Sequence, residues 1–131
     1  MVVRTKLDVK GFSEYLEKIA RSGRDIDPIT DRALDAGGQV LLGGMQRRVP
    51  KDTRNLEGHL EIEGPLQDGN FHYIFVGLSR RSDAETARYG NAQEFGTANM
   101  AAQPYIRPTL DADMGKAKKA MKEVFEEEEV L

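Results

Sequence analysis

The sequence has no cysteine, no tryptophan and no long hydrophobic run, and each absence excludes a class of structure or site. Without cysteine there can be no disulfide, thiolate metal site or cysteine nucleophile, which is ordinary for a protein that matures in a reducing cytoplasm. A membrane-spanning helix needs roughly 20 consecutive apolar residues, and residues 1–30 lack the pattern of a signal peptide. We therefore expect a soluble protein without a recognisable leader.

Aromatic residues are also scarce, at 7% of 131 residues, so the core must be built mainly from aliphatic side chains and methionine. A chain of this length is expected to form one domain around one core. Its 22 acidic and 19 basic residues leave a formal net charge of -3. Because this charge does not attract nucleic acid or an anionic membrane, we expect protein partners, without specific nucleic-acid binding or membrane binding.

The amino-terminal residues alternate between apolar and charged side chains, which predicts a half-buried strand or, alternatively, an ordered arm over residues 1–10. The apolar set is Val3, Thr5, Leu7 and Val9. A first helix is predicted after Gly11, because apolar residues then recur at helical spacing until Ser22-Gly23.

Asp27-Pro28 predicts the start of a second helix, with Asp27 as its cap, that runs to about Arg47 or Arg48. Four glycines lie inside it, and each costs about 1 kcal/mol relative to alanine. They are Gly37, Gly38, Gly43 and Gly44. Two explanations stay open: a kink, or a strip of small residues where the first helix or another subunit packs closely. In the second case, Gly37 and Gly44 would belong to a contact surface.

Two strands are predicted next, His59–Glu63 and Phe71–Leu78, with turn sequences at Gly64-Pro65 and Asp68-Gly69-Asn70. The second of these strands is apolar on both faces. It is therefore expected to be central in its sheet or to be covered by a partner.

Residues 80–88 are polar and follow neither period, so we expect a mobile loop that orders on binding. Its arginines are candidate contacts: Arg80, Arg81 and Arg88.

A last helix is predicted from Pro108, and its acidic end should fray over residues 126–131 because it opposes the helix dipole. Together these elements predict an α+β fold, with a small antiparallel sheet packed against two or three helices in a single domain over residues 1–131.

Reactive side chains show little organisation in the sequence. His59 and His72 lack metal-ligand spacing, and no serine lies in a nucleophile motif. A hydrolase or metal enzyme built on these histidines is the weakest hypothesis. A basic cluster follows the second helix and offers a nucleic-acid-binding alternative, although cations also complement a helix carboxyl end. The cluster consists of Arg47, Arg48, Lys51 and Arg54.

Three motifs in a fixed order resemble the phage tail-component family, which includes neck or tail-completion proteins of long-tailed phages. The first is Val49-Pro50-Lys51-Asp52-Thr53-Arg54-Asn55-Leu56, the second is Tyr89 followed by Glu94-Phe95-Gly96-Thr97, and the third is Gln103-Pro104-Tyr105-Ile106-Arg107-Pro108-Thr109-Leu110. Arg54 stands where this family typically has glycine. The resemblance extends from about the second helix to the end of the chain.

The resemblance implies a structural virion protein of the head–tail junction, assembled in the cytoplasm of the bacterial host, with no catalytic activity and no cofactor. It implies a homo-oligomer, with a ring as the expected form, that docks to tail and head-completion proteins. For the matched residues we expect backbone-shaping roles. Asp52 and Thr53 would fix a turn, Glu94 would accept a hydrogen bond from Arg107 or a backbone amide, Phe95 would anchor its turn, and Gly96 would supply an unusual backbone angle.

Overall fold

The computed structural model describes residues 3–51, 56–69 and 71–129. Its helices are α1 (Ser13–Arg21), α2 (Ile26–Arg48), α3 (Ala84–Phe95) and α4 (Arg107–Glu129), with short 3-10 helices at Lys10–Phe12 and Leu56–His59. Its strands are β1 (Arg4–Asp8), β2 (Leu60–Asp68) and β3 (Phe71–Leu78). These strands form an antiparallel sheet in the order β1-β3-β2. The predicted α+β class is confirmed.

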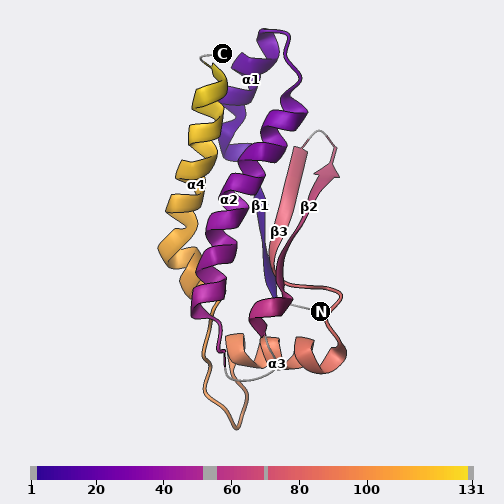
Figure 1. Cartoon of the computed structure of the whole chain (residues 1–131), viewed down its shortest axis with the longest axis vertical. Coiled ribbons are helices and arrows are strands. Elements are labelled where there is room, and N and C mark those ends of the chain that lie inside the picture. The colour runs from indigo at the N-terminus through magenta and orange to yellow at the C-terminus, as the bar shows by residue number, and fades with distance from the viewer. Residues whose placement is uncertain (1–2, 52–55, 70, 130–131) are drawn as a thin grey trace.

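The elements lie in layers along the long axis of the molecule (Figure 1). The long helix α2 packs against one face of the sheet, and α4 packs along α2. Near one end of this axis, α1 lies beside the carboxyl end of α4, whereas α3 crosses the opposite end (Figure 1). The two ends of the molecule are therefore built from different elements.

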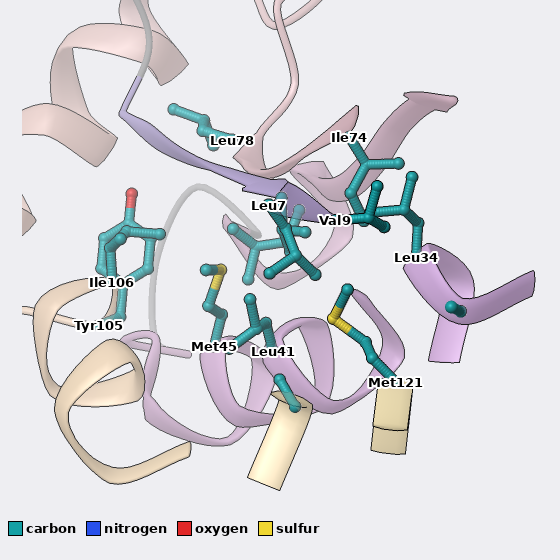
Figure 2. Packing of buried hydrophobic residues seen from close by; sticks show 14 of the residues in the cluster. Leu7, Val9, Leu34, Leu41, Met45, Ile74, Leu78, Tyr105, Ile106 and Met121 are labelled. Atoms are coloured by element: carbon teal, nitrogen blue, oxygen red, sulfur yellow. The ribbon is translucent and has the colours of Figure 1, made fainter. Parts of the chain in front are cut away.

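The core fills the space between the sheet and the two long helices. Figure 2 shows Leu41 and Met45 of α2 directed at Leu7 of β1, and both α2 side chains are fully buried. From α4, the buried residues of the inward stripe follow a spacing of four: Thr109, Asp113, Ala117, Met121 and Phe125. Leu110 and Met114 lie beside this stripe and are half-buried.

Strand β3 is central, as one of the two sequence interpretations had it. Its inward residues face α2, whereas Tyr73 and Phe75 lie on the opposite face.

Gly64-Pro65 does not form the expected turn. Strand β2 continues through it with a shift in register between Glu63 and Leu66, because the antiparallel ladder resumes beyond the proline. The hairpin turn follows Asp68 instead, and Asn70 lies outside the described residues.

Three of the four glycines of α2, Gly37, Gly38 and Gly44, are explained by close packing within the chain. Cβ atoms added at these positions would lie 2.8 Å from Met121 Cγ at Gly37, 2.7 Å from Ile74 Cδ1 at Gly38 and 2.2 Å from Asp113 Oδ2 at Gly44. Helix α2 is a single uninterrupted helix. The closely packed elements are α4 and the sheet, not α1 or a second subunit. Because Gly37 and Gly44 are buried inside the protomer, they do not offer the contact surface that the sequence suggested.

Helix α2 begins at Ile26, two residues earlier than expected. Its cap is Asp25, whose Oδ1 accepts a hydrogen bond from the backbone N–H of Asp27 at 3.1 Å. Pro28 therefore occupies the third helical position, where its missing N–H is still one of the unpaired amides of the first turn.

The segment expected to be a mobile loop is largely helical. Helix α3 begins at Ala84, so only residues 79–83 connect it to β3. The helix was hidden in the sequence because its buried side is polar or small and shows no apolar period. The buried residues are Thr86, Gly90, Gln93 and Glu94.

The acidic end of α4 is ordered through Glu129 and is not a frayed tail. Glu128 is buried and accepts hydrogen bonds from Arg24 and Arg32, while Glu129 pairs with Lys18 at 3.5 Å. These cations offset the unfavourable helix dipole. Residues 130–131 lie outside the described part.

Candidate functional site

The carboxylate of Glu94 joins the end of α3 to the beginning of α4. Its Oε1 accepts hydrogen bonds from the backbone N–H groups of Tyr105 at 2.8 Å and Ile106 at 2.7 Å, and its Oε2 accepts one from Arg107 N–H at 3.0 Å. These amides belong to the start of α4, where helical backbone N–H groups lack partners within the helix. Glu94 is only 6% exposed, so the bonds are shielded from water. We call this arrangement the Glu94 clamp.

Tyr105 reinforces the same junction from within the core. Its side chain is fully buried, and its hydroxyl donates a hydrogen bond to the backbone carbonyl of Gly90 at 3.1 Å. Burial, and secondarily the negative charge of Glu94, raise the pKa of the Tyr105 phenol. A Cβ at Gly90 would lie 2.7 Å from Leu78 Cδ2, so glycine lets α3 approach β3 closely.

Beyond α3 the chain reverses at Gly96, which has a positive φ of 77° that favours glycine. The loop is held by backbone hydrogen bonds, from Thr97 N–H to Met100 O at 2.9 Å and from Gln103 N–H to Gln93 O at 2.7 Å. Phe95 does not anchor this turn as expected. Its side chain is 74% exposed because it lies on the outer side of α3, next to the buried Glu94.

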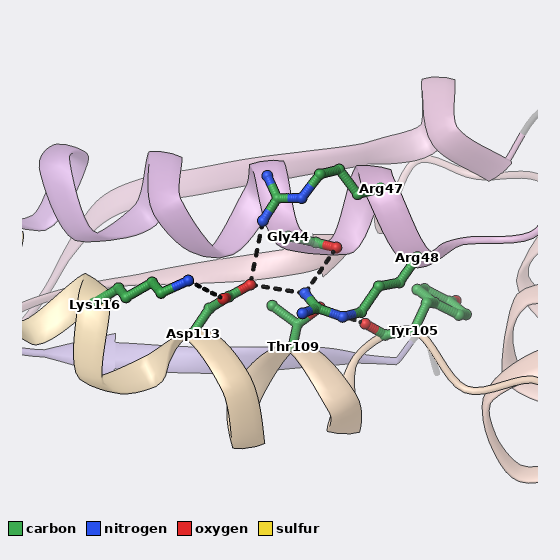
Figure 3. Close-up of polar contacts among 7 residues, drawn as sticks. All are labelled: Gly44, Arg47, Arg48, Tyr105, Thr109, Asp113 and Lys116. Carbon is green, nitrogen blue, oxygen red and sulfur yellow. Dashed lines mark hydrogen bonds and ion pairs between the residues drawn. The ribbon is translucent and has the colours of Figure 1, made fainter.

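A second polar cluster lies where α2 crosses the first turns of α4 (Figure 3). Asp113 Oδ2 is 2.7 Å from Arg48 Nη1 and 3.5 Å from Arg47 Nη2, and Lys116 Nζ is 3.7 Å from Oδ1. Hydrogen bonding from Arg48 outweighs burial and holds the pKa of Asp113 below its ordinary value. Arg48 also donates to Thr109 Oγ1 and to the Gly44 carbonyl, both at 3.3 Å.

The outer face of the sheet carries aromatic side chains with cations stacked on them. The Arg4 guanidinium lies 3.8 Å from the centre of the Phe75 ring, and Lys6 Nζ lies 4.4 Å from the centre of the Tyr73 ring. Glu63 pairs with Arg4 at 3.4 Å and also receives two hydrogen bonds from Arg80, each of 2.9 Å. This face has an apolar row with a charged border.

An apolar cavity of about 260 Å³ opens at the end of the molecule that carries α1. We call it the α1–α2–β3 pocket. Its apolar lining is Val9, Leu16, Ala20, Ile26 and Phe71, and Glu17, Asp27 and His72 are among its polar residues. His72 Nδ1 lies 2.6 Å from Asp31 Oδ1, and this carboxylate oxygen is the acceptor.

The two histidines do not share a site. His59 precedes Leu60 at the beginning of β2, whereas His72 pairs with Gln67, seven residues further along, which corresponds to roughly 23 Å at about 3.3 Å per residue. Within residues 3–51, 56–69 and 71–129, no group of three or more His, Asp or Glu side chains is arranged to hold a metal ion. His59 instead lies 3.0 Å from Ser82 Oγ.

Comparison with known proteins identifies the family. A family model described as “Bacteriophage HK97-gp10, putative tail-component” matches residues 10–96. The chain belongs to this family. No curated protein and no solved structure matches it. Membership supports a structural role in the virion and confirms the resemblance to phage tail components. The matched residues include the first motif and the second as far as Gly96, whereas the third motif lies beyond them. This family is one of phage tail components and not a known class of enzymes.

In this tail-component protein, the first and third motifs contribute to the core as well as to the surface. Leu56 and Tyr105 are fully buried, whereas Pro104 and Arg107 are exposed. Among the other motif positions, Pro50, Tyr89 and Pro108 are half-buried and Thr97 is exposed. Asp52, Thr53 and Arg54 lie outside the described residues.

The basic groups beside α2 are occupied by pairing within the chain. Arg47 and Arg48 bind Asp113, and Lys51 pairs with Glu57 at 2.9 Å. Arg80 and Arg81 bind Glu63 and Glu61 of β2, so they hold the segment after β3 against the sheet. Arg88 is exposed on α3, with no ion pair among the described residues.

Sequence reasoning missed the Asp113 cluster. Arg48 and Asp113 are 65 positions apart, so no local pattern connects them. One signal was present: Thr109 and Asp113 continue the spacing of Ala117, Met121 and Phe125 toward the start of α4. A polar pair on an otherwise apolar stripe indicates a buried polar contact with the facing helix.

Proposed function

We propose that the protein is a structural subunit of the phage head–tail junction, acting as a neck or tail-completion protein. It forms an oligomer, with a ring as the assembled form, and docks to neighbouring tail and head-completion proteins. In the virion it acts without catalysis and without a cofactor. Family membership over residues 10–96 is the observation that carries this proposal.

The surface of the subunit supports a docking role. Two large apolar side chains are exposed within the described residues, Phe71 at 43% and Phe95 at 74%. The polar groups described above are mostly engaged in holding elements together, as in the Glu94 clamp and the Asp113 cluster. No helix in the described part of the chain is long and apolar enough to cross a membrane. Exposed aromatic side chains are typical anchors of protein interfaces.

The nucleic-acid alternative is not favoured by the geometry. Three of the four residues in its basic cluster make ion pairs or hydrogen bonds within the chain, and Arg54 lies outside the described residues. DNA phosphates would have to compete with Asp113 and Glu57 for these cations. DNA binding that weakens steeply with salt and is lost when these cations are neutralised would support the alternative.

Assembly of virions tests the proposal most directly. In a phage that lacks this gene, we expect filled heads and separate tails by electron microscopy, and a plasmid copy should restore joined particles. Light scattering after size-exclusion chromatography should show an oligomer, or a complex with a neighbouring junction protein. A strict monomer that binds no junction protein, together with normal particles from the deletion phage, would contradict the proposal.

A further inference from the structure

We propose that Phe95 of one copy inserts into the α1–α2–β3 pocket of a second copy. This inference rests on the proposed function, because it names one contact through which the subunit would assemble. It joins two different surfaces, so every copy contributes one phenylalanine and one pocket. Contacts of this kind build closed rings or open chains.

Phe95 is presented on a rigid support. It is the last residue of α3, and the preceding Glu94 is fixed by three hydrogen bonds to the start of α4. The following Gly96 N–H bonds to Ala92 O at 2.7 Å and closes the helix. A side chain held in this way loses little backbone freedom on binding, which favours association. Its 74% exposure leaves most of the ring available to a partner.

The pocket has the size and lining that a phenyl ring requires. Its volume is about 260 Å³. An apolar protein cavity of about 150 Å³ is large enough to bind benzene. Leu16 of α1, Ile26 of α2 and Phe71 of β3 supply apolar walls from three different elements. The exposed Phe71 would be covered by the same contact, so one interface would bury both large exposed apolar side chains.

The two surfaces lie at opposite ends of the long axis (Figure 1). Helix α3 crosses one end, and α1 with the start of α2 forms the other. Phe95 therefore cannot reach the pocket of its own chain, and only another molecule can satisfy both surfaces.

Charge favours the same pairing. Arg88 precedes Phe95 by seven residues and thus lies on the same side of α3, without an ion pair among the described residues. The border of the pocket carries two exposed carboxylates: Glu17, which lies 3.7 Å from Arg21, and Asp27, which lies 3.6 Å from His72 Nε2. Docking of Phe95 brings the cation toward these acids, which would orient the incoming helix and speed association.

Two variants and their mixture test the inference. Phe95→Ser removes the inserted ring but keeps the pocket, whereas Ala20→Trp fills the pocket from an exposed position and keeps Phe95. We expect wild-type protein to oligomerise, each variant alone to be monomeric, and self-association to weaken by about 10- to 100-fold. The equimolar mixture should form a dimer and nothing larger, because only one intact contact remains.

Matched controls separate docking from folding. Ala112→Trp adds the same ring at an exposed site on α4 outside the pocket and should assemble like the wild type. All variants should keep the wild-type circular dichroism, and they should keep the wild-type melting temperature at dilutions where the wild type is monomeric, because association itself raises the melting temperature. The inference is overturned if the wild type stays monomeric at its highest soluble concentration, if either variant assembles like the wild type, or if the mixture forms no dimer.

The outcomes also separate this contact from the proposed function. Undiminished assembly of both variants, with restored phage joining, would refute the Phe95 contact and leave the junction role intact. Normal particles without the gene would refute the junction role itself. A pocket variant that loses binding only to a different junction protein would identify that protein as the occupant and overturn self-association.

Discussion

The guanidinium of Arg48 on α2 lies 2.7 Å from the carboxylate of Asp113 on α4, at the place where Gly44 lets the two helices approach. The Asp113 side chain is only 2% exposed, whereas that of Arg48 is 29% exposed. A nearly buried carboxylate is thus neutralised by a cation that reaches water. The glycine at position 44 therefore makes room for the ion pair between Arg48 and Asp113.

Replacing Asp113 with alanine should destabilise the fold by about 2 kcal/mol, because hydrogen bonds to charged groups contribute on that order. The partly exposed Arg48 can turn toward water, which keeps the loss below that of a fully buried pair. Urea unfolding monitored by circular dichroism measures the change. Asp111→Ala on the exposed side of α4 is the control and should shift the free energy of unfolding by less than about 0.5 kcal/mol. Equal effects of the two substitutions would contradict the structural role of Asp113.

Stability should fall in acid through Asp113 and Glu128. Hydrogen bonds from Arg48, and from Arg24 and Arg32, lower the pKa values of these carboxyl groups in the folded protein. Their stabilising contribution is therefore present above the ordinary carboxyl pKa of about 4 and is lost as the pH falls through the lower folded-state values. Melting temperatures measured from about pH 7 to about pH 3 should show the decline.

Two glutamate-to-glutamine substitutions near the carboxyl end of α4 test this pH dependence. Glu128→Gln should flatten the acid decline, because its carboxylate is paired with two arginines. Glu126→Gln removes an exposed carboxylate and should keep the wild-type slope. Identical slopes for wild type and Glu128→Gln would show that this carboxylate does not contribute.

The Glu94 clamp should be needed for the junction of α3 and α4. Glu94→Ala leaves three backbone amides without their acceptor and should cost about 2 to 4 kcal/mol, because unsatisfied buried groups are expensive. Glu94→Gln keeps one acceptor oxygen and should cost less. Hydrogen exchange at Tyr105, Ile106 and Arg107 should accelerate in the alanine variant before the core opens. Unchanged protection at these amides would contradict the clamp.

Two adjacent glycines of α2 should respond oppositely to alanine. At Gly43 the nearest atom to an added Cβ is Arg47 Nη1 at 3.4 Å, so Gly43→Ala should stabilise the protein by up to about 1 kcal/mol through helix propensity. At Gly44 the Cβ would lie 2.2 Å from Asp113 Oδ2 and 2.8 Å from Thr109 Cγ2. Gly44→Ala should therefore destabilise by about 1 to 3 kcal/mol, as overpacking does. Thermal and urea unfolding measure whether the free energy of unfolding of each variant rises or falls. A stabilised Gly44→Ala would refute close packing at this position.

Local patterns predicted much of the fold, because hydrophobic periodicity is a local property of the chain. The alternation before Gly11 predicted a strand or an arm, and the strand β1 is what forms. The apolar residues of 71–78 predicted that β3 is central or covered by a partner, and it is central in the sheet. Helix α3 escaped prediction because Thr86, Gly90, Gln93 and Glu94 give its buried side no apolar period. The sequence did not predict the ordered end of α4, because the residues that neutralise Glu128, Arg24 and Arg32, lie about 100 positions away.

By itself, the sequence determined the α+β class, the carboxyl end of α2 and the three motifs that resemble those of phage tail components. Tertiary structure decided what the motif residues do. It turned Glu94 toward three amides at and just before the start of α4 and left Phe95 facing solvent, although the two residues are adjacent. The reason is geometric: successive helical residues point in directions about 100° apart, and only the packing of α4 defines which direction is inside.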